Sequence, residues 1–133
     1  METKFNFNSQ ICTTREQSER LLSLGLKKET ADMGIYYSEL YGVDRVFPND
    51  VFDEKPTFDS DEIPAWSLHR LIEIVPSTIN KMLWFTITPY TALYDSVDYS
   101  KSFDSKDNLY DNIIDCIEWL IKEGYFNKEY LED

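Results

Sequence analysis

The feature that most constrains the fold of this chain is an apolar face near the C-terminus, repeated at the spacing of an α-helix as far as about Glu123. The residues on this face are Leu109, Ile113, Cys116, Ile117 and Leu120. A helix with so much apolar surface must be buried against another layer of structure. Ser105 or Asp107 can cap its start, and Gly124 can adopt the left-handed conformation that ends it. We therefore expect this helix to lie within the core.

Two further helices are predicted from the residues that begin and end them. Thr14 and Gln17 form a capping box for a helix that runs to about Leu24 and ends at Gly25. Pro64 fits the first turn of the second helix, because the N–H group that proline lacks has no helical partner there. The second helix has an apolar stripe at helical spacing, which consists of Ala65, Leu68, Leu71, Ile72 and Val75.

Strands are predicted in stretches that are rich in β-branched and aromatic residues and are bounded by glycine or proline. These stretches are 34–41, a short strand at 45–47, 81–88, and a hairpin partner at 91–97. Because helices and strands do not alternate regularly, this order favours an α+β fold with three main helices packed on a small antiparallel sheet of three to five strands. The residues predicted to be nearly inaccessible, with Trp84 close to them, are Leu68, Ile72, Ile113, Ile117 and Leu120.

The charge of the chain limits its possible partners. Its 133 residues, which we interpret as a single compact domain over 1–133, carry a net charge of −12. We expect 48–62 to be an acidic loop within that domain. Such a surface repels polyanions, so we expect no direct nucleic-acid binding and no membrane binding. It can attract a basic protein, with Asp59, Asp61 and Glu62 as candidate contacts, although solubility alone also explains the charge.

The two cysteines, Cys12 and Cys116, are far apart in the sequence and form no metal-binding pair. We see no apolar segment typical of a signal peptide, and no apolar run has the length of a membrane span. We therefore expect a cytoplasmic protein with two free thiols, of which Cys116 is a small core residue.

No pattern in the sequence is typical of a catalytic, metal or cofactor site. His69 is the single histidine, and we interpret it as a packing residue at the border of an apolar stripe. The acids at 59–62 and 95–98 lack the ligand spacing of a calcium loop. The four isolated glycines form no phosphate-binding loop. We therefore expect no cofactor and no metal.

Trp66 and Trp119 lie off the apolar faces of their predicted helices. One interpretation is that each packs under a loop or across the edge of a sheet, because tryptophan is usually mostly buried. The other is that one or both contribute to a protein-binding surface, where aromatic residues are enriched.

Several short segments together carry a resemblance. They are Thr13-Thr-Arg-Glu-Gln-Ser18, Thr30-Ala-Asp-Met33, Asp61-Glu-Ile-Pro-Ala-Trp-Ser-Leu68 and Glu118-Trp-Leu-Ile-Lys-Glu-Gly-Tyr125. With them the chain resembles a group of small uncharacterised proteins of gut bacteria and their prophages. The resemblance implies no activity, ligand or catalytic residue.

The sequence favours a non-enzymatic protein-interaction or accessory protein, and the resemblance to prophage proteins adds the expectation that a mobile element encodes it. One alternative is a small hydrolase that uses scattered carboxylates and His69, and a deep pocket holding that histidine and two acids would favour it. The other is an acidic nucleic-acid mimic that inhibits a basic protein, and a convex acidic face would favour it.

Overall fold

The computed structural model describes residues 9–49 and 58–133. Its α-helices are α1 (Arg15–Ser23), α2 (Leu68–Ile74) and α3 (Leu109–Glu123), and two short 3-10 helices span Lys28–Thr30 and Lys128–Tyr130. Its strands are β1 (Met33–Ser38), β2 (Val43–Pro48), β3 (Glu62–Ala65), β4 (Thr78–Ile79), β5 (Leu83–Ile87), β6 (Ala92–Asp95) and β7 (Ser100–Phe103). The fold is therefore mixed α+β with three α-helices, as predicted.

The strands form two antiparallel sheets, so the prediction of one sheet of three to five strands is not confirmed. One sheet has the order β2-β1-β3 and the other β4-β5-β6-β7. The segment around Pro64, predicted to start a helix, instead forms β3 and pairs with β1. Pro64 lies opposite Gly34 at the edge of the sheet, where a missing N–H group costs little.

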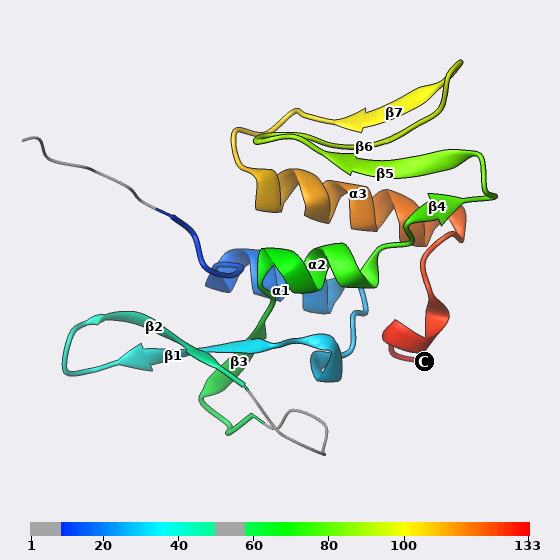
Figure 1. Cartoon of the computed structure of the whole chain (residues 1–133). Helices are drawn as coiled ribbons and strands as arrows, with labels where there is room; N and C mark the ends of the chain where they lie inside the picture. The colour runs from blue at the N-terminus through cyan, green and yellow to red at the C-terminus, as the bar shows by residue number, and fades with distance from the viewer. Residues whose placement is uncertain (1–8, 50–57) are drawn as a thin grey trace, which may run out of the picture.

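One layer of the molecule is α3, which lies against one face of the four-stranded sheet (Figure 1). Alternation along the strands turns Phe85, Tyr94 and Phe103 toward this helix. Trp84 points to the opposite face and is 54% exposed. The expectation that Trp84 lies close to the core is therefore wrong.

The predicted core residues of α3 are buried as expected, but those of α2 are not. Ile113, Ile117 and Leu120 are fully buried, whereas Leu68 and Ile72 are only half-buried. The helix α2 begins after Ser67 rather than at Pro64, and its interior positions are taken by Leu71 and Ile74. This changes which residues of the apolar stripe face the core.

Both ends of α1 and the C-terminal end of α3 follow the sequence signals. In α1, the Gln17 amide donates to Thr14 Oγ1 (3.2 Å) and the Thr14 amide donates to Gln17 Oε1 (3.0 Å), which confirms the capping box. Gly25 and Gly124 both have positive φ angles, +98° and +80°. The start of α3 is capped by Asn108, one residue after the range that the sequence indicates.

A hydrogen-bond network, buried at Thr13 and partly buried at Asp32, joins segments 13–18, 30–33 and 61–68. Thr13 Oγ1 accepts a bond from the Trp66 amide (3.0 Å) and is bonded to Ser18 Oγ (2.7 Å). Asp32 accepts bonds from the Ser67 amide (2.9 Å) and hydroxyl (2.6 Å). These segments therefore meet in space to hold α1, α2 and β3 together, which is a structural reason for their residue types.

Candidate functional site

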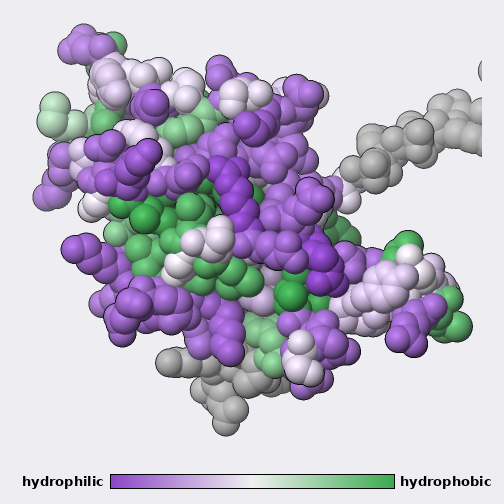
Figure 2. Space-filling model, turned by 180° about the vertical axis from the view of Figure 1, so that it is seen from behind, coloured by the Kyte–Doolittle hydropathy of each residue, from purple (hydrophilic) through white to green (hydrophobic). Residues whose placement is uncertain are grey.

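Six large exposed apolar or aromatic side chains lie on the hairpin β1–β2, residues 33–48, which we call the arm. The arm projects from the rest of the molecule (Figure 1), and in the view from behind its surface mixes hydrophobic, intermediate and hydrophilic residues (Figure 2). Leu40, at the tip, is 84% exposed. The other large exposed side chains of the arm are Tyr36, Tyr37, Tyr41, Val43 and Val46.

Contacts within the arm hold it in shape although little else covers it. Phe47 lies across Gly34, and its ring is only 2.3 Å from the position that a Cβ atom on this glycine would occupy. The same ring contacts Tyr36, with centroids 5.9 Å apart. The Arg45 guanidinium lies 4.9 Å from the centroid of the Tyr41 ring, a favourable cation–π distance. The arm is therefore an ordered projection, with its own aromatic packing.

The candidate acids Asp59, Asp61 and Glu62 lie beside the arm, at the start of β3. Glu62 is paired with Tyr36 in the sheet. A tight turn holds the group, because the Glu62 amide donates to the Asp59 carbonyl (3.0 Å) and the Asp59 amide donates to Glu62 Oε1 (2.8 Å). Within residues 9–49 and 58–133, none of the three carboxylates forms an ion pair. Residues 50–57 of the predicted acidic loop lie outside the described residues.

A groove of about 350 Å³ separates the arm from the segment that precedes α1, and Ile11, Ile35 and Val46 are among its lining residues. The Arg15–Asp44 ion pair (2.8 Å) lies along it. The hydrogen bonds from Arg15 hold the pKa of the Asp44 carboxyl below its usual value. The groove therefore combines apolar side chains with one fixed ion pair.

The thiol of Cys12 also lines this groove. Burial, and then the charge of Asp32, raise its pKa to about 11. The thiol is therefore neutral at physiological pH, and it is not an activated nucleophile.

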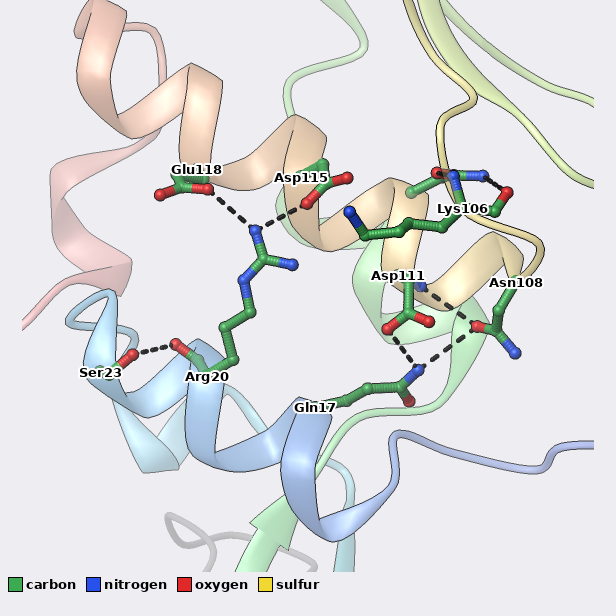
Figure 3. Close-up of polar contacts among 9 residues, drawn as sticks. Gln17, Arg20, Ser23, Lys106, Asn108, Asp111, Asp115 and Glu118 are labelled. Atoms are coloured by element: carbon green, nitrogen blue, oxygen red, sulfur yellow. Dashed lines mark hydrogen bonds and ion pairs between the residues drawn. The ribbon is translucent and has the colours of Figure 1, made fainter.

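Three acidic side chains of α3, Asp111, Asp115 and Glu118, bond to side chains of α1 (Figure 3). Arg20 forms ion pairs with Asp115 (2.7 Å) and Glu118 (2.8 Å). Gln17 donates to Asp111 Oδ1 (2.8 Å). These carboxylates therefore join two helices.

Neither candidate tryptophan presents an open binding surface. Trp66 has no exposed area, and its indole N–H donates to Thr30 Oγ1 (2.9 Å). Trp119 is partly buried between α3 and the four-stranded sheet. Its ring centroid lies 6.2 Å from that of Tyr94, 5.7 Å from that of Phe103 and 5.7 Å from that of Tyr125. Both tryptophans therefore serve packing.

The surroundings of His69 give no support to a hydrolase. Its side chain is 84% exposed, so the predicted packing role is wrong, and its nearest charged partner is Glu73 at 3.7 Å. The hydroxyl of Ser67 donates to Asp32 and caps α2 without contacting this histidine. His69 does not line the groove beside the arm, the hollow between α2 and the C-terminal segment, or a smaller hollow near Tyr125. Among the residues that the structure describes, no group of three His, Cys, Asp or Glu side chains is placed to hold a metal ion.

A larger hollow of about 550 Å³ lies between α2 and the C-terminal segment. Its charged lining mixes both signs, with Lys27 and Arg70 among several glutamates. Arg70 is already committed to Glu73 (3.2 Å) and to the Thr30 carbonyl (2.8 Å). We see no convergent set of free groups in this hollow.

Comparisons with known proteins add no functional information: no family model, no curated protein and no solved structure matches the chain. Across the part of the chain that the structure describes, no helix is long and apolar enough to cross a membrane.

Sequence reasoning found the acids of this site and the two strands of the arm, but it missed the exposure of the arm's aromatic side chains. A signal was present, because Ile35-Tyr36-Tyr37 and Leu40-Tyr41 are apolar runs without the alternation of a strand that buries one face. Consecutive apolar residues in an antiparallel hairpin place apolar side chains on both of its faces. One of those faces then lies open unless another element covers it.

Proposed function

We propose that this protein is a non-enzymatic interaction module that binds a basic protein through the arm and the carboxylates beside it. The observation that carries the proposal is the position of Asp59, Asp61 and Glu62 next to exposed aromatic side chains of β1. Protein interfaces combine apolar anchors with a polar rim, and tyrosine is enriched among their central residues. A net charge of −12 steers a basic protein toward this surface.

The nucleic-acid mimic makes a different prediction about which residues matter. A mimic acts through its charges, so removing apolar side chains from the arm would leave its affinity unchanged. An interaction module that uses the arm depends both on the apolar side chains of the arm and on the carboxylates beside it. Variants of the two groups therefore separate these alternatives.

The test begins with affinity purification of the partner from the native host and its identification by mass spectrometry. Binding of that purified partner is then measured at low and high salt. Leu40→Ser should weaken binding about tenfold or more, and its matched control is Val97→Ser, a fully exposed residue outside the arm. The control should bind as the wild type does.

The carboxylates are tested with the triple variant Asp59→Asn, Asp61→Asn, Glu62→Gln. Its matched control changes Asp98, Asp104 and Glu123, which are exposed elsewhere, in the same way. We expect only the first variant to lose both affinity and salt dependence, because steering by charge weakens as salt screens it. Equal affinity of the wild type, the Leu40 variant and the triple variant would contradict the proposal.

A further inference from the structure

The outer edge of β2 has no strand partner among the described residues. In the order β2-β1-β3, this strand lies at the edge of its sheet and pairs with β1 alone. All of its residues except Phe47 are exposed. An edge strand presents backbone N–H and C=O groups that an extended segment of another protein can pair with.

The register of the arm shows which backbone groups point outward. In an antiparallel pair, residues that exchange hydrogen bonds alternate with residues that do not. The Asn49 amide donates to the Asp32 carbonyl (3.0 Å), which sets this alternation along the hairpin. By this alternation Arg45 bonds to β1, whereas Asp44 and Val46 direct their N–H and C=O groups away from it.

The groove lies on the matching face of this edge. Asp44 and Val46 both line it, together with Ile11 and Ile35. Cross-strand partners in a sheet place their side chains on the same face. A residue of an added strand opposite Val46 therefore directs its side chain to the groove, which has room for an aliphatic group.

We propose that the basic partner docks by adding an extended segment antiparallel to the outer edge of β2, with an aliphatic side chain in the groove. This inference rests on the proposed function and names the chemistry of the partner's segment: an extended strand with aliphatic residues at alternate positions and lysine or arginine at its ends. Pro48, which has no N–H group, limits the main-chain pairing to the bonds of Asp44 and Val46.

Charge favours a basic segment over a second copy of this chain. The carboxylates at the start of β3 lie two strand spacings, about 10 Å, from the outer edge of β2, which is close to one Debye length in physiological salt. A second copy brings another net charge of −12. Antiparallel pairing of two β2 strands, with Asp44 opposite Val46, also places the two Arg45 side chains opposite each other, which is unfavourable.

The test uses a defined peptide, acetyl-Lys-Thr-Val-Thr-Val-Thr-Lys-amide, and the full chain labelled with ¹⁵N. One control peptide has both valines N-methylated, so that they cannot donate, and another has glutamate in place of lysine. We expect the first peptide to slow amide exchange at Asp44 and Val46. Both control peptides should bind about tenfold more weakly or worse.

The protein variants are Val46→Pro, which removes the outward N–H group at an edge position that tolerates proline, and Val46→Thr, which keeps it. Val46→Pro should abolish peptide binding, whereas Val46→Thr should retain it. Unchanged exchange at the Gly34 and Tyr36 amides shows that the proline variant keeps its hairpin. If the proline variant loses its hairpin, the test is the comparison of the N-methylated and unmodified lysine peptides in binding to the wild-type protein.

Three results would overturn strand addition. They are no binding of the lysine peptide at millimolar concentration, equal binding of the N-methylated peptide, and protection at β7 instead of β2. A dimer in solution that Val46→Pro dissociates would assign the edge to a second copy. If the native partner depends on Leu40 and salt but binds Val46→Pro normally, the proposed function stands and strand addition fails.

Discussion

The arm and the described residues outside it, which we call the body, use similar aromatic residues in opposite ways. The body comprises residues 9–32, 49 and 58–133. Between α3 and the four-stranded sheet, Tyr94 is fully buried and its hydroxyl donates to the Pro76 carbonyl (2.6 Å). In the arm, Tyr37 and Tyr41 are more than half exposed. Burial of an aromatic ring contributes to folding, whereas an exposed ring on an ordered strand is available to a partner. This difference underlies our proposal that the body carries the stability and the arm carries recognition.

The carboxylates show the same contrast. In the body, Asp115 and Glu118 share Arg20 and join α1 to α3. Beside the arm, Asp59 and Asp61 have no ion pair among the described residues. Unpaired acids close to one another repel and reduce stability slightly, so their position beside an apolar projection supports a role in binding.

The largest expected difference between body and arm is in the cost of removing a large side chain. Trp66→Ala should lower the free energy of unfolding by about 3–5 kcal/mol, because it empties a fully buried site and leaves Thr30 without its donor. Leu40→Ala should change it by no more than about 0.5 kcal/mol. Urea unfolding monitored by circular dichroism measures both. A cost above 2 kcal/mol for Leu40→Ala would show that the arm is part of the stability core.

A smaller effect is expected at Gly34, within the arm. Gly34→Ala places a Cβ atom where the Phe47 ring lies, so the ring must move away at a cost of about 1–3 kcal/mol. The double variant with Phe47→Ala removes the clash and should show a strong interaction energy between the two sites. Additive costs in the double-mutant cycle would contradict this packing.

The smallest effect is expected for the Arg15–Asp44 ion pair. Because the folded pKa of Asp44 is lowered, its contribution is present above the unfolded pKa of about 3.9 and is lost as pH falls through the folded pKa. Both side chains are about a third exposed, so Asp44→Asn should cost less than about 1 kcal/mol at pH 7. Unfolding of the wild type and of Asp44→Asn, measured at pH 7 and again in acid, checks this, because the difference between them should shrink in acid.

The sequence signals predicted α3 better than β3 for a physical reason. The apolar face of α3 and its terminal Gly124 are local features, and the structure confirms both. The strand β3 was not predictable locally, because proline is compatible with a first helical turn and with a sheet edge. Only its pairing with β1, which is distant in sequence, decides between them.

The candidate site shows the same limit. Asp59, Asp61 and Glu62 stand out as acids in the sequence, but their position beside Tyr36 depends on the sheet pairing. The burial of Trp66 likewise depends on Thr13 and Thr30, which lie far from it in the chain. Exposure of an aromatic residue is a tertiary property, and periodicity does not reveal it.

The most direct test of recognition by the arm is amide hydrogen exchange of the full chain with and without the purified native partner. We predict that the partner slows exchange in β2 and at the start of β3, and leaves α3 and β5–β7 unchanged. Protection confined to the open face of the four-stranded sheet, around Trp84, with no change in the arm, would contradict the division of this protein into a stable body and a binding arm.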